Sequence, residues 1–117
     1  MLLSGGYMKI VHIITRFIRG GADENTLYSC NGQAEQGHEV YLMYGRENHA
    51  DILGRLHPDV RPICIDALVR EVSPVKDLQA LLDMGLRLRK IRPDLVHTHT
   101  SKAGVVGRLA AMFSQSP

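Results

Sequence analysis

Residues 9–22 read KIVHIITRFIRGGA, and this stretch decides the fold class that the 117-residue sequence predicts. Residues 9–15 form a nearly continuous apolar run that is rich in β-branched side chains. Such a run is typical of a strand covered on both faces in a parallel sheet. Gly20 and Gly21 follow, and helical periodicity begins at Ala22. The order of strand, glycine loop and helix predicts the first unit of an α/β fold.

The next elements continue this alternation. A helix is predicted over residues 22–36, because its apolar side chains recur on one face, and Gly37 is placed to end it. The side chains of that face are Leu27, Cys30 and Ala34. Residues 38–44 alternate into a second strand. Residues 47–56 predict a weak helix or turn, and residues 60–65 predict a third strand.

The second half of the chain adds two helices and a strand. Ser73 and Pro74 are typical of an N-cap and first helical position, so a helix is predicted from there to Ile91. Its broad apolar face consists of Leu78, Leu81, Leu82, Leu88 and Ile91. Residues 95–98 predict a fourth strand and residues 102–113 a fourth helix. The whole series predicts an α/β, Rossmann-like three-layer sandwich with a mostly parallel sheet.

Composition narrows the function classes. The formal charge of +2 and the aromatic content of 5% give neither the basic surface nor the stacking platforms of a nucleic-acid-binding protein, so no nucleic-acid partner is expected. No apolar run approaches the ~20 residues of a membrane-spanning helix. Residues 1–7 are predicted to be a disordered tail and residues 8–117 one domain. Cys30 and Cys64 are predicted to be reduced core residues, which favours a cytoplasmic setting.

Polar donors gather where the fourth strand ends. His97 and His99 share one face of that strand, at the end where ligands bind in open parallel sheets. Thr100, Ser101 and Lys102 follow at the start of the next helix. Imidazole, hydroxyl, ammonium and free helix N–H groups together suit phosphates or sugar hydroxyls. In the alternative interpretation, the hydroxyls only cap the helix and the histidines only pack.

A metal site is a further alternative, because an H-x-H pair on a strand projects two imidazoles to one side. His97 and His99 would need a third ligand. Three other histidines have no diagnostic spacing for that role: His38, His49 and His57. His12, in the middle of the first strand, is predicted to be a hydrogen-bonded core residue. We therefore expect no metal and no cofactor.

The glycine loop has two interpretations of similar weight. Gly20 and Gly21 would let the backbone and helix N-terminus approach a phosphate, with Arg16 as a possible additional phosphate contact. Alternatively, they only form a tight turn. Asp23 and Glu24 would weaken a diphosphate contact by repulsion if their side chains turned inward. Neither a dinucleotide fingerprint nor a P-loop motif is present.

Neither candidate site offers the groups that hydrolysis requires. No nucleophile with a positioned base and no pair of carboxylates is evident at the glycine loop or at the histidines. The end of the predicted helix over residues 74–91 carries a different signal, since it is rich in basic residues. These are Arg87, Arg89, Lys90 and Arg92. They complement the helix dipole, and in a second interpretation they contact anionic lipid headgroups.

Three segments together resemble a known family. MKIVHIITRFIRGGA, GQAEQGHEVYLMYG and RPDLVHTHTSKAGVVGRLAAMF resemble, in order and spacing, the N-terminal domain of family-4-type retaining glycosyltransferases of the GT-B fold. The resemblance covers residues 8–113 and is weakest over residues 46–72. The HTHTSKAG segment is most similar to members that build bacterial surface polysaccharides.

The resemblance implies two Rossmann-like domains that face a cleft, with the acceptor held mainly by the N-terminal domain and a nucleotide-sugar donor by the C-terminal one. Gly20 and Gly21 match the loop near the donor diphosphate. The segment that lines the cleft is matched by His97, His99, Thr100, Ser101 and Lys102. The glycine loop and this segment are expected to meet at one edge of the sheet.

The chain departs from the family by stopping before a fifth strand, whose histidine lies at the reaction centre, and before the donor domain. It is therefore expected to be the truncated N-terminal half of a GT-B architecture, incomplete at its C-terminus and inactive alone. The parent is expected to transfer a sugar with retention to a lipid-linked or polysaccharide acceptor. A cytoplasmic location is expected, with peripheral contact at the inner face of the membrane. The alternative is a non-catalytic, flavodoxin-like module that binds a phosphorylated ligand.

Overall fold

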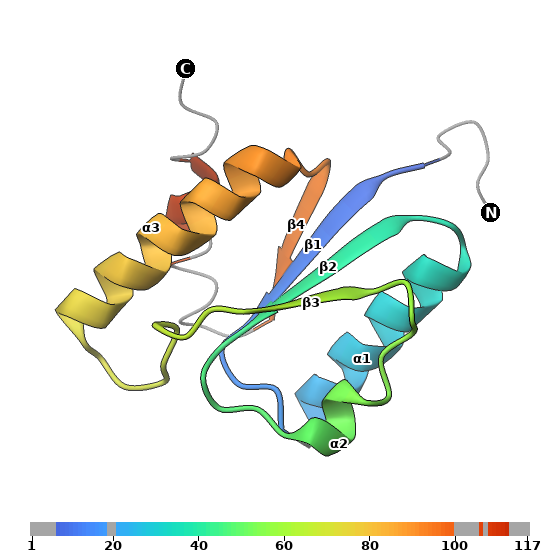
Figure 1. Cartoon of the computed structure of the whole chain (residues 1–117), viewed down its shortest axis with the longest axis horizontal. Helices are drawn as coiled ribbons and strands as arrows, with labels where there is room; N and C mark the ends of the chain where they lie inside the picture. Colours follow the sequence, from blue (N-terminus) through green and yellow to red (C-terminus); the bar gives the residue numbers. More distant parts are fainter. Residues whose placement is uncertain (1–6, 19–20, 100–105, 107, 113–117) are drawn as a thin grey trace.

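The computed structural model describes residues 7–18, 21–99, 106 and 108–112. Within these residues, the strands form one parallel sheet in the order β3-β2-β1-β4 (Figure 1). The strands are β1 (Lys9–Ile14), β2 (Glu39–Tyr44), β3 (Arg61–Cys64) and β4 (Leu95–Thr98). The helices are α1 (Gly21–Glu35), α2 (Ala50–Leu53) and α3 (Pro74–Ile91), and residues 106 and 108–112 are also helical. This arrangement confirms the predicted α/β, Rossmann-like fold class.

Strand β1 lies between β2 and β4 and pairs with both. Lys9 is the register partner of Glu39 in β2, and Ile10 is the register partner of Leu95 in β4. The chain moves outward from β1 through β2 to β3 and then returns to the other side of β1. The strand order therefore reverses between β1 and β4, which is the point where open α/β sheets bind ligands beyond the carboxyl ends of their strands.

Two apolar clusters cover the two faces of the sheet, and Figure 1 shows α1 and α2 on one side and α3 on the other. The cluster on the first side includes Ile14, Leu27, Cys30, Val40 and Ile52. The cluster on the second side includes Val11, Ile13, Met43, Met84, Leu88, Val106 and Ala110. Side chains alternate along β1 and β2, so each strand contributes to both clusters.

Several local predictions are confirmed. The fourth strand and the helix after Ser73 have the predicted bounds, and the Ser73 side chain accepts a hydrogen bond from the backbone N–H of Lys76 at 3.4 Å. Gly37 ends the turn after α1 with a φ of 93°, which favours glycine. The apolar face predicted for α1 is buried at Leu27, Cys30 and Ala34.

The prediction that Cys64 is a core residue is wrong. Cys64 is exposed, whereas Cys30 is buried. Strand β3 lies at the edge of the sheet, and of its four residues only Ile63 is partly buried. An edge strand has a neighbour on one side only, so a short apolar sequence there does not guarantee burial.

The predicted apolar face of α3 is also partly wrong. Leu88 is buried, and Leu81 and Ile91 are partly buried, but Leu78 and Leu82 are exposed. The helix instead packs through Ala80, Met84, Gly85 and Leu88. Small side chains at residues 80 and 85 let this stripe approach the sheet closely, so the bulkier leucines on the other side of α3 are left exposed.

Gly45 is packed against backbone where β2 leaves the sheet. Its N–H donates to the carbonyl oxygen of Ile14 at 3.2 Å. A Cβ at this position would lie 2.1 Å from the carbonyl oxygen of Thr15 and 2.2 Å from that of Leu68. Neither backbone group can move without disturbing the end of β1 or the loop after β3, so this position requires glycine.

Replacing Gly45 by alanine is therefore expected to lower the free energy of unfolding by about 3 kcal/mol or more, because the added methyl group overlaps two backbone carbonyls. Gly32→Ala is the matched control, since nothing lies within 4 Å of a Cβ there and the residue is inside α1. That control is expected to stabilise the protein by about 0.5–1 kcal/mol. Urea unfolding measures both changes, and a Gly45→Ala protein as stable as wild type would contradict the packing described.

Candidate functional site

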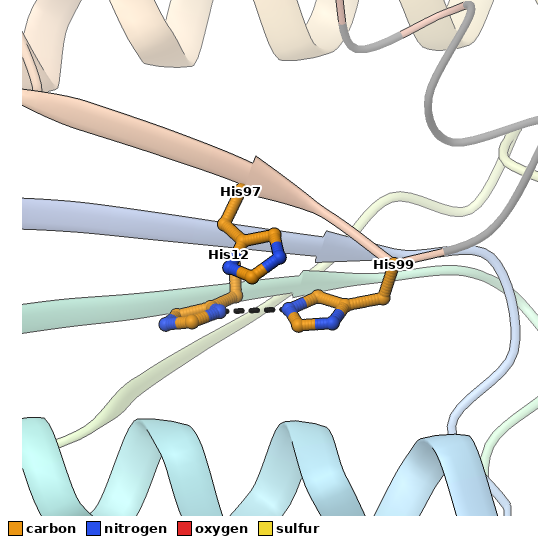
Figure 2. Close-up of side chains that lie close together, drawn as sticks. All are labelled: His12, His97 and His99. Atoms are coloured by element: carbon orange, nitrogen blue, oxygen red, sulfur yellow. Dashed lines mark hydrogen bonds between the residues drawn. The ribbon is translucent and has the colours of Figure 1, made fainter.

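Three histidines from two neighbouring strands form a cluster on the α1 side of the sheet (Figure 2). His12 lies in β1 and is the register partner of His97 in β4. His99 follows β4 directly, and its backbone N–H donates to the carbonyl oxygen of Ile13 at 2.9 Å. The parallel pairing of β1 with β4 therefore fixes the backbone at all three positions.

The three rings are close enough to interact directly. Nδ1 of His12 lies 2.8 Å from Nε2 of His99. The rings of His97 and His99 are stacked, with centroids 4.2 Å apart and an interplanar angle of 23°. The ring centroids of His12 and His97 are 5.5 Å apart. Burial decreases outward, from the fully buried His12 through the partly buried His99 to the exposed His97.

Gln33 in α1 determines how the protons are distributed. Its amide oxygen Oε1 lies 2.7 Å from Nε2 of His12. Because an amide oxygen only accepts hydrogen bonds, Nε2 of His12 carries the hydrogen and Nδ1 is left as an acceptor. Nε2–H of His99 then donates to that nitrogen. The result is a chain of hydrogen bonds from His99 through His12 to Gln33.

The environment of His12 and His99 favours neutral imidazoles. Burial lowers the pKa of His12, and the charge that His97 would carry lowers it further, although the hydrogen bond with Gln33 acts in the opposite direction. Burial, followed by the charges of His12 and His97, lowers the pKa of His99 to about 4. Neutral rings can donate and accept hydrogen bonds or act as metal ligands.

The other predicted site residues are placed only in part. Gly21 is the first residue of α1, which follows the carboxyl end of β1. Strand β1 carries His12 and lies beside β4, which carries His97. Nη1 of Arg16 lies 3.9 Å from Oε2 of Glu47, a long ion pair between two half-exposed side chains. Four members of the predicted site lie outside the described residues: Gly20, Thr100, Ser101 and Lys102. The meeting of the glycine loop with residues 100–102 stays a prediction.

Both acidic residues after the glycine loop are already bonded to other groups. Oδ2 of Asp23 accepts a hydrogen bond from the backbone N–H of Ile18 at 2.9 Å. The Glu24 carboxylate forms a two-pronged ion pair with Arg55, with both N–O distances 2.9 Å. The Glu24 charge is thus directed toward a neighbouring cation, which reduces the repulsion expected from the sequence.

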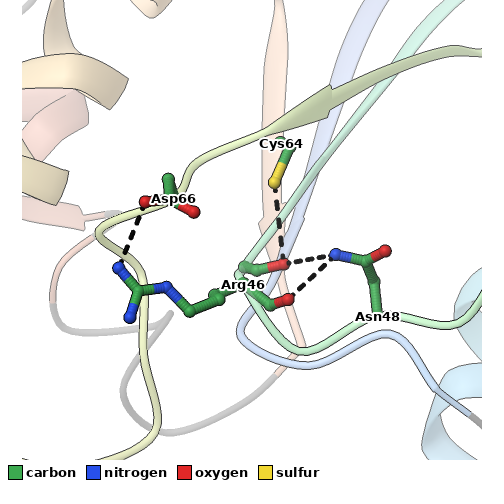
Figure 3. A network of polar contacts seen from close by, with 5 residues as sticks. Arg46, Asn48, Cys64 and Asp66 are labelled. Carbon is green, nitrogen blue, oxygen red and sulfur yellow. Dashed lines mark hydrogen bonds and ion pairs between the residues drawn. The ribbon is translucent and has the colours of Figure 1, made fainter.

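A second polar region lies at the carboxyl ends of β2 and β3. Arg46 pairs with Asp66 at 3.1 Å, and the Asn48 amide donates to the carbonyl oxygens of Gly45 and Arg46 (Figure 3). These bonds fix the loop after β2. A cavity of about 380 Å³ lies beside it, lined by Arg46, Glu47, Val69, Glu71, Ser73 and Lys76. This cavity was not predicted from the sequence, because most of its lining comes from loops of irregular pattern and only Lys76 belongs to a helix.

Residues 19–117 match the model of the family described as Glycosyltransferase Family 4. The chain belongs to glycosyltransferase family 4. This membership confirms the resemblance found in the sequence, and the parallel sheet with helices is consistent with a domain of the GT-B fold.

Two curated glycosyltransferases are similar to this family 4 chain. An Escherichia coli protein named UDP-Gal:alpha-D-GlcNAc-diphosphoundecaprenol alpha-1,3-galactosyltransferase is 39% identical over 110 residues, which cover 94% of the chain. The Staphylococcus aureus protein named capsular polysaccharide biosynthesis glycosyltransferase CapM is 40% identical over 48 residues, which cover 41% of the chain. The chain spans only 28% of the first relative and 13% of the second.

The part that His12 plays in this cluster was not predicted from the sequence. The expectation that it is buried and hydrogen-bonded is confirmed, but its partners are His99 and Gln33. The signal that could have revealed this is the strand order. Once β4 is placed beside β1, a histidine at the matching register becomes a neighbour of the H-x-H pair.

In metal-free buffer, His99 is expected to titrate near pH 4, below the ordinary histidine value of about 6.5 that the unfolded chain should show. Between these values the unfolded chain binds more protons, so the free energy of unfolding should fall as the pH is lowered from 6.5 toward 4. Histidine side-chain NMR and urea unfolding at several pH values measure both effects.

His99→Gln is the control for this titration, because its amide N–H can still donate to His12 but cannot titrate. In this variant, the free energy of unfolding should depend less on pH, and the remaining dependence should come from His12. A wild-type His99 that titrates at the ordinary histidine value would contradict the described burial.

Proposed function

We propose that this chain is the acceptor-side domain of a glycosyltransferase that transfers a sugar, with retention, from a nucleotide-sugar donor to a lipid-linked or polysaccharide acceptor. The observation that carries the proposal is the cluster of three histidines at the strand-order reversal of a family 4 chain. The name of the Escherichia coli relative supports a diphosphate-linked lipid as the acceptor class.

The histidines suit contact with an acceptor better than they suit chemistry. His97 is exposed and His99 partly buried, so both can reach a ligand at the carboxyl edge of the sheet. Because the Nε2–H of His99 is donated to His12, the Nδ1 of His99 is the nitrogen that can accept a hydrogen bond from a sugar hydroxyl. The bond to His12 holds the ring of His99 in one orientation before the ligand arrives. Such preorganisation reduces the entropy cost of binding.

The start of α1 suits the donor diphosphate. Gly21 opens a 15-residue helix, and the N–H groups of a first helical turn have no partner within the helix. Together with the helix dipole they favour an anion. We assign Gly20, Gly21 and Arg16 to this contact, and Thr100, Ser101 and Lys102 to the acceptor side with the two histidines.

The catalytic group and the rest of the donor site are assigned to a part of the enzyme outside this chain, so the chain alone should not transfer sugar.

Titration with GlcNAc α-diphosphate carrying a short prenyl chain tests this proposal. NMR shifts are expected at the side chains of His97 and His99, and no product should form when UDP-galactose is added. His97→Ala and His99→Ala should each weaken binding about three- to tenfold, because each removes a hydrogen bond between neutral groups. His49→Ala is the matched control, since His49 is exposed and lies before α2. Binding that neither site variant weakens would overturn the assignment.

We also propose that the exposed face of α3 contacts an anionic membrane. Val75, Leu78, Leu82 and Leu86 form an apolar stripe at helical spacing, with exposed fractions of 68%, 55%, 45% and 64%. The exposed Arg89 and Lys90 in the last turn add positive charge. Among the described residues, no helix combines the length and the apolar character needed to cross a bilayer. An apolar stripe with a basic end suits a surface contact with anionic headgroups.

Flotation with phosphatidylcholine vesicles, with and without phosphatidylglycerol, measures this contact. Binding is expected only with phosphatidylglycerol and should weaken as salt is raised, because salt screens Arg89 and Lys90. Leu82→Ser combined with Leu86→Ser should reduce partitioning about tenfold or more. Tyr28→Ser is the control, because Tyr28 is an exposed residue of α1 on the other side of the sheet. Equal losses in both proteins would exclude α3 as the membrane contact.

A further inference from the structure

We propose that His12, His97 and His99 form a binding site for a divalent transition metal, with zinc as the expected ion. Each histidine offers one ring nitrogen, and these nitrogens all lie within 4.8 Å of one another. The site does not depend on the proposed transferase function. The sequence predicted no metal because no third histidine had a diagnostic spacing, whereas the pairing of β1 with β4 supplies His12 as that ligand.

The geometry requires only small movements of side chains. Zinc binds imidazole nitrogen at about 2.0–2.1 Å, so two ligand nitrogens of a tetrahedral site lie about 3.3 Å apart. Nδ1 of His12 and Nε2 of His99 are 2.8 Å apart and would separate by about half an ångström to admit the ion. The ring of His97 rotates away from the ring of His99, so that one of its nitrogens becomes the third ligand. The backbone stays in place, because the strand pairing holds all three positions.

Gln33 prepares His12 for this role. By accepting the hydrogen on Nε2, its amide oxygen leaves the lone pair of Nδ1 directed at His99. Metal-binding histidines commonly have such a partner on the second nitrogen, which fixes the tautomer and orients the ring. When the ion replaces the hydrogen between the rings, His99 remains neutral by carrying its hydrogen on Nδ1, so binding requires no net loss of a proton.

The donor set and its exposure select the type of ion. Three imidazoles suit zinc, copper and nickel, whereas magnesium and calcium prefer oxygen ligands. His12 closes the buried side of the cluster, while the exposed His97 leaves the opposite side open. A tetrahedral ion held by three histidines therefore keeps one position for water or another oxygen ligand.

Zinc titration of the EDTA-treated protein against a chromophoric chelator tests the site. One equivalent of zinc is expected, and magnesium should not compete. His97→Ala and His99→Ala should each lower the affinity at least about tenfold, and His97→Ala leaves the core intact because the side chain is exposed. His49→Ala should bind like wild type. Histidine ¹⁵N spectra of the wild-type protein should show a metal on Nδ1 of His12 while Nε2 stays protonated.

Two changes at Gln33 separate metal coordination from a merely structural role. Gln33→Ala should lower zinc affinity about 10–100-fold, whereas Gln33→Glu should raise it, because a carboxylate makes His12 a more basic ligand. A structural role alone would make both variants worse. The proposal is overturned if zinc binds in several weak equivalents, if His97→Ala leaves the affinity unchanged, or if Cys64→Ser abolishes binding and so identifies the exposed thiol as the ligand.

Discussion

The parallel pairing of β1 with β4 is the constraint on which the rest of the structure depends. It places β1 at the centre of the sheet and buries His12 completely. Burying a polar ring is costly unless its nitrogens are hydrogen-bonded. Gln33 and His99 satisfy both nitrogens. The same two hydrogen bonds therefore stabilise the buried ring of His12 and hold the ring of His99 in place. A change that breaks one of them affects both the packing of the sheet and the histidine cluster.

The same pairing helps to explain why the pKa values of His12 and His99 are lowered. Burial disfavours a protonated ring, and protonation of more than one ring would place positive charges next to one another, so the pKa of His99 is lowered. An uncharged cluster contributes little to long-range attraction of an anionic substrate. In the proposed function, attraction of a diphosphate is therefore assigned to the start of α1, and the histidines are assigned short-range contacts.

Local patterns in the sequence were sufficient for most of the fold. The β-branched run over residues 9–15 predicts a central strand, and Ser73 with Pro74 predicts the start of α3. Patterns that depend on neighbours far along the chain were not sufficient. The leucines of α3 point in several directions around the helix. The sequence therefore does not reveal that Ala80 and Met84 face the sheet. For the same reason, the partnership of His12 with His99 required the strand order, which no local pattern specifies.

Helix α1 carries Gly21 at its first residue and Gln33 near its last turn. Gln33 holds His12, and His12 holds His99, so the helix is joined mechanically to the histidine cluster. A helix moves nearly as a rigid rod, and a ligand that pulled on the start of α1 would also displace Gln33. The orientation of the His99 ring would then follow that displacement. A single helix thereby connects the backbone at Gly21 with the ring of His99 through two successive side-chain hydrogen bonds.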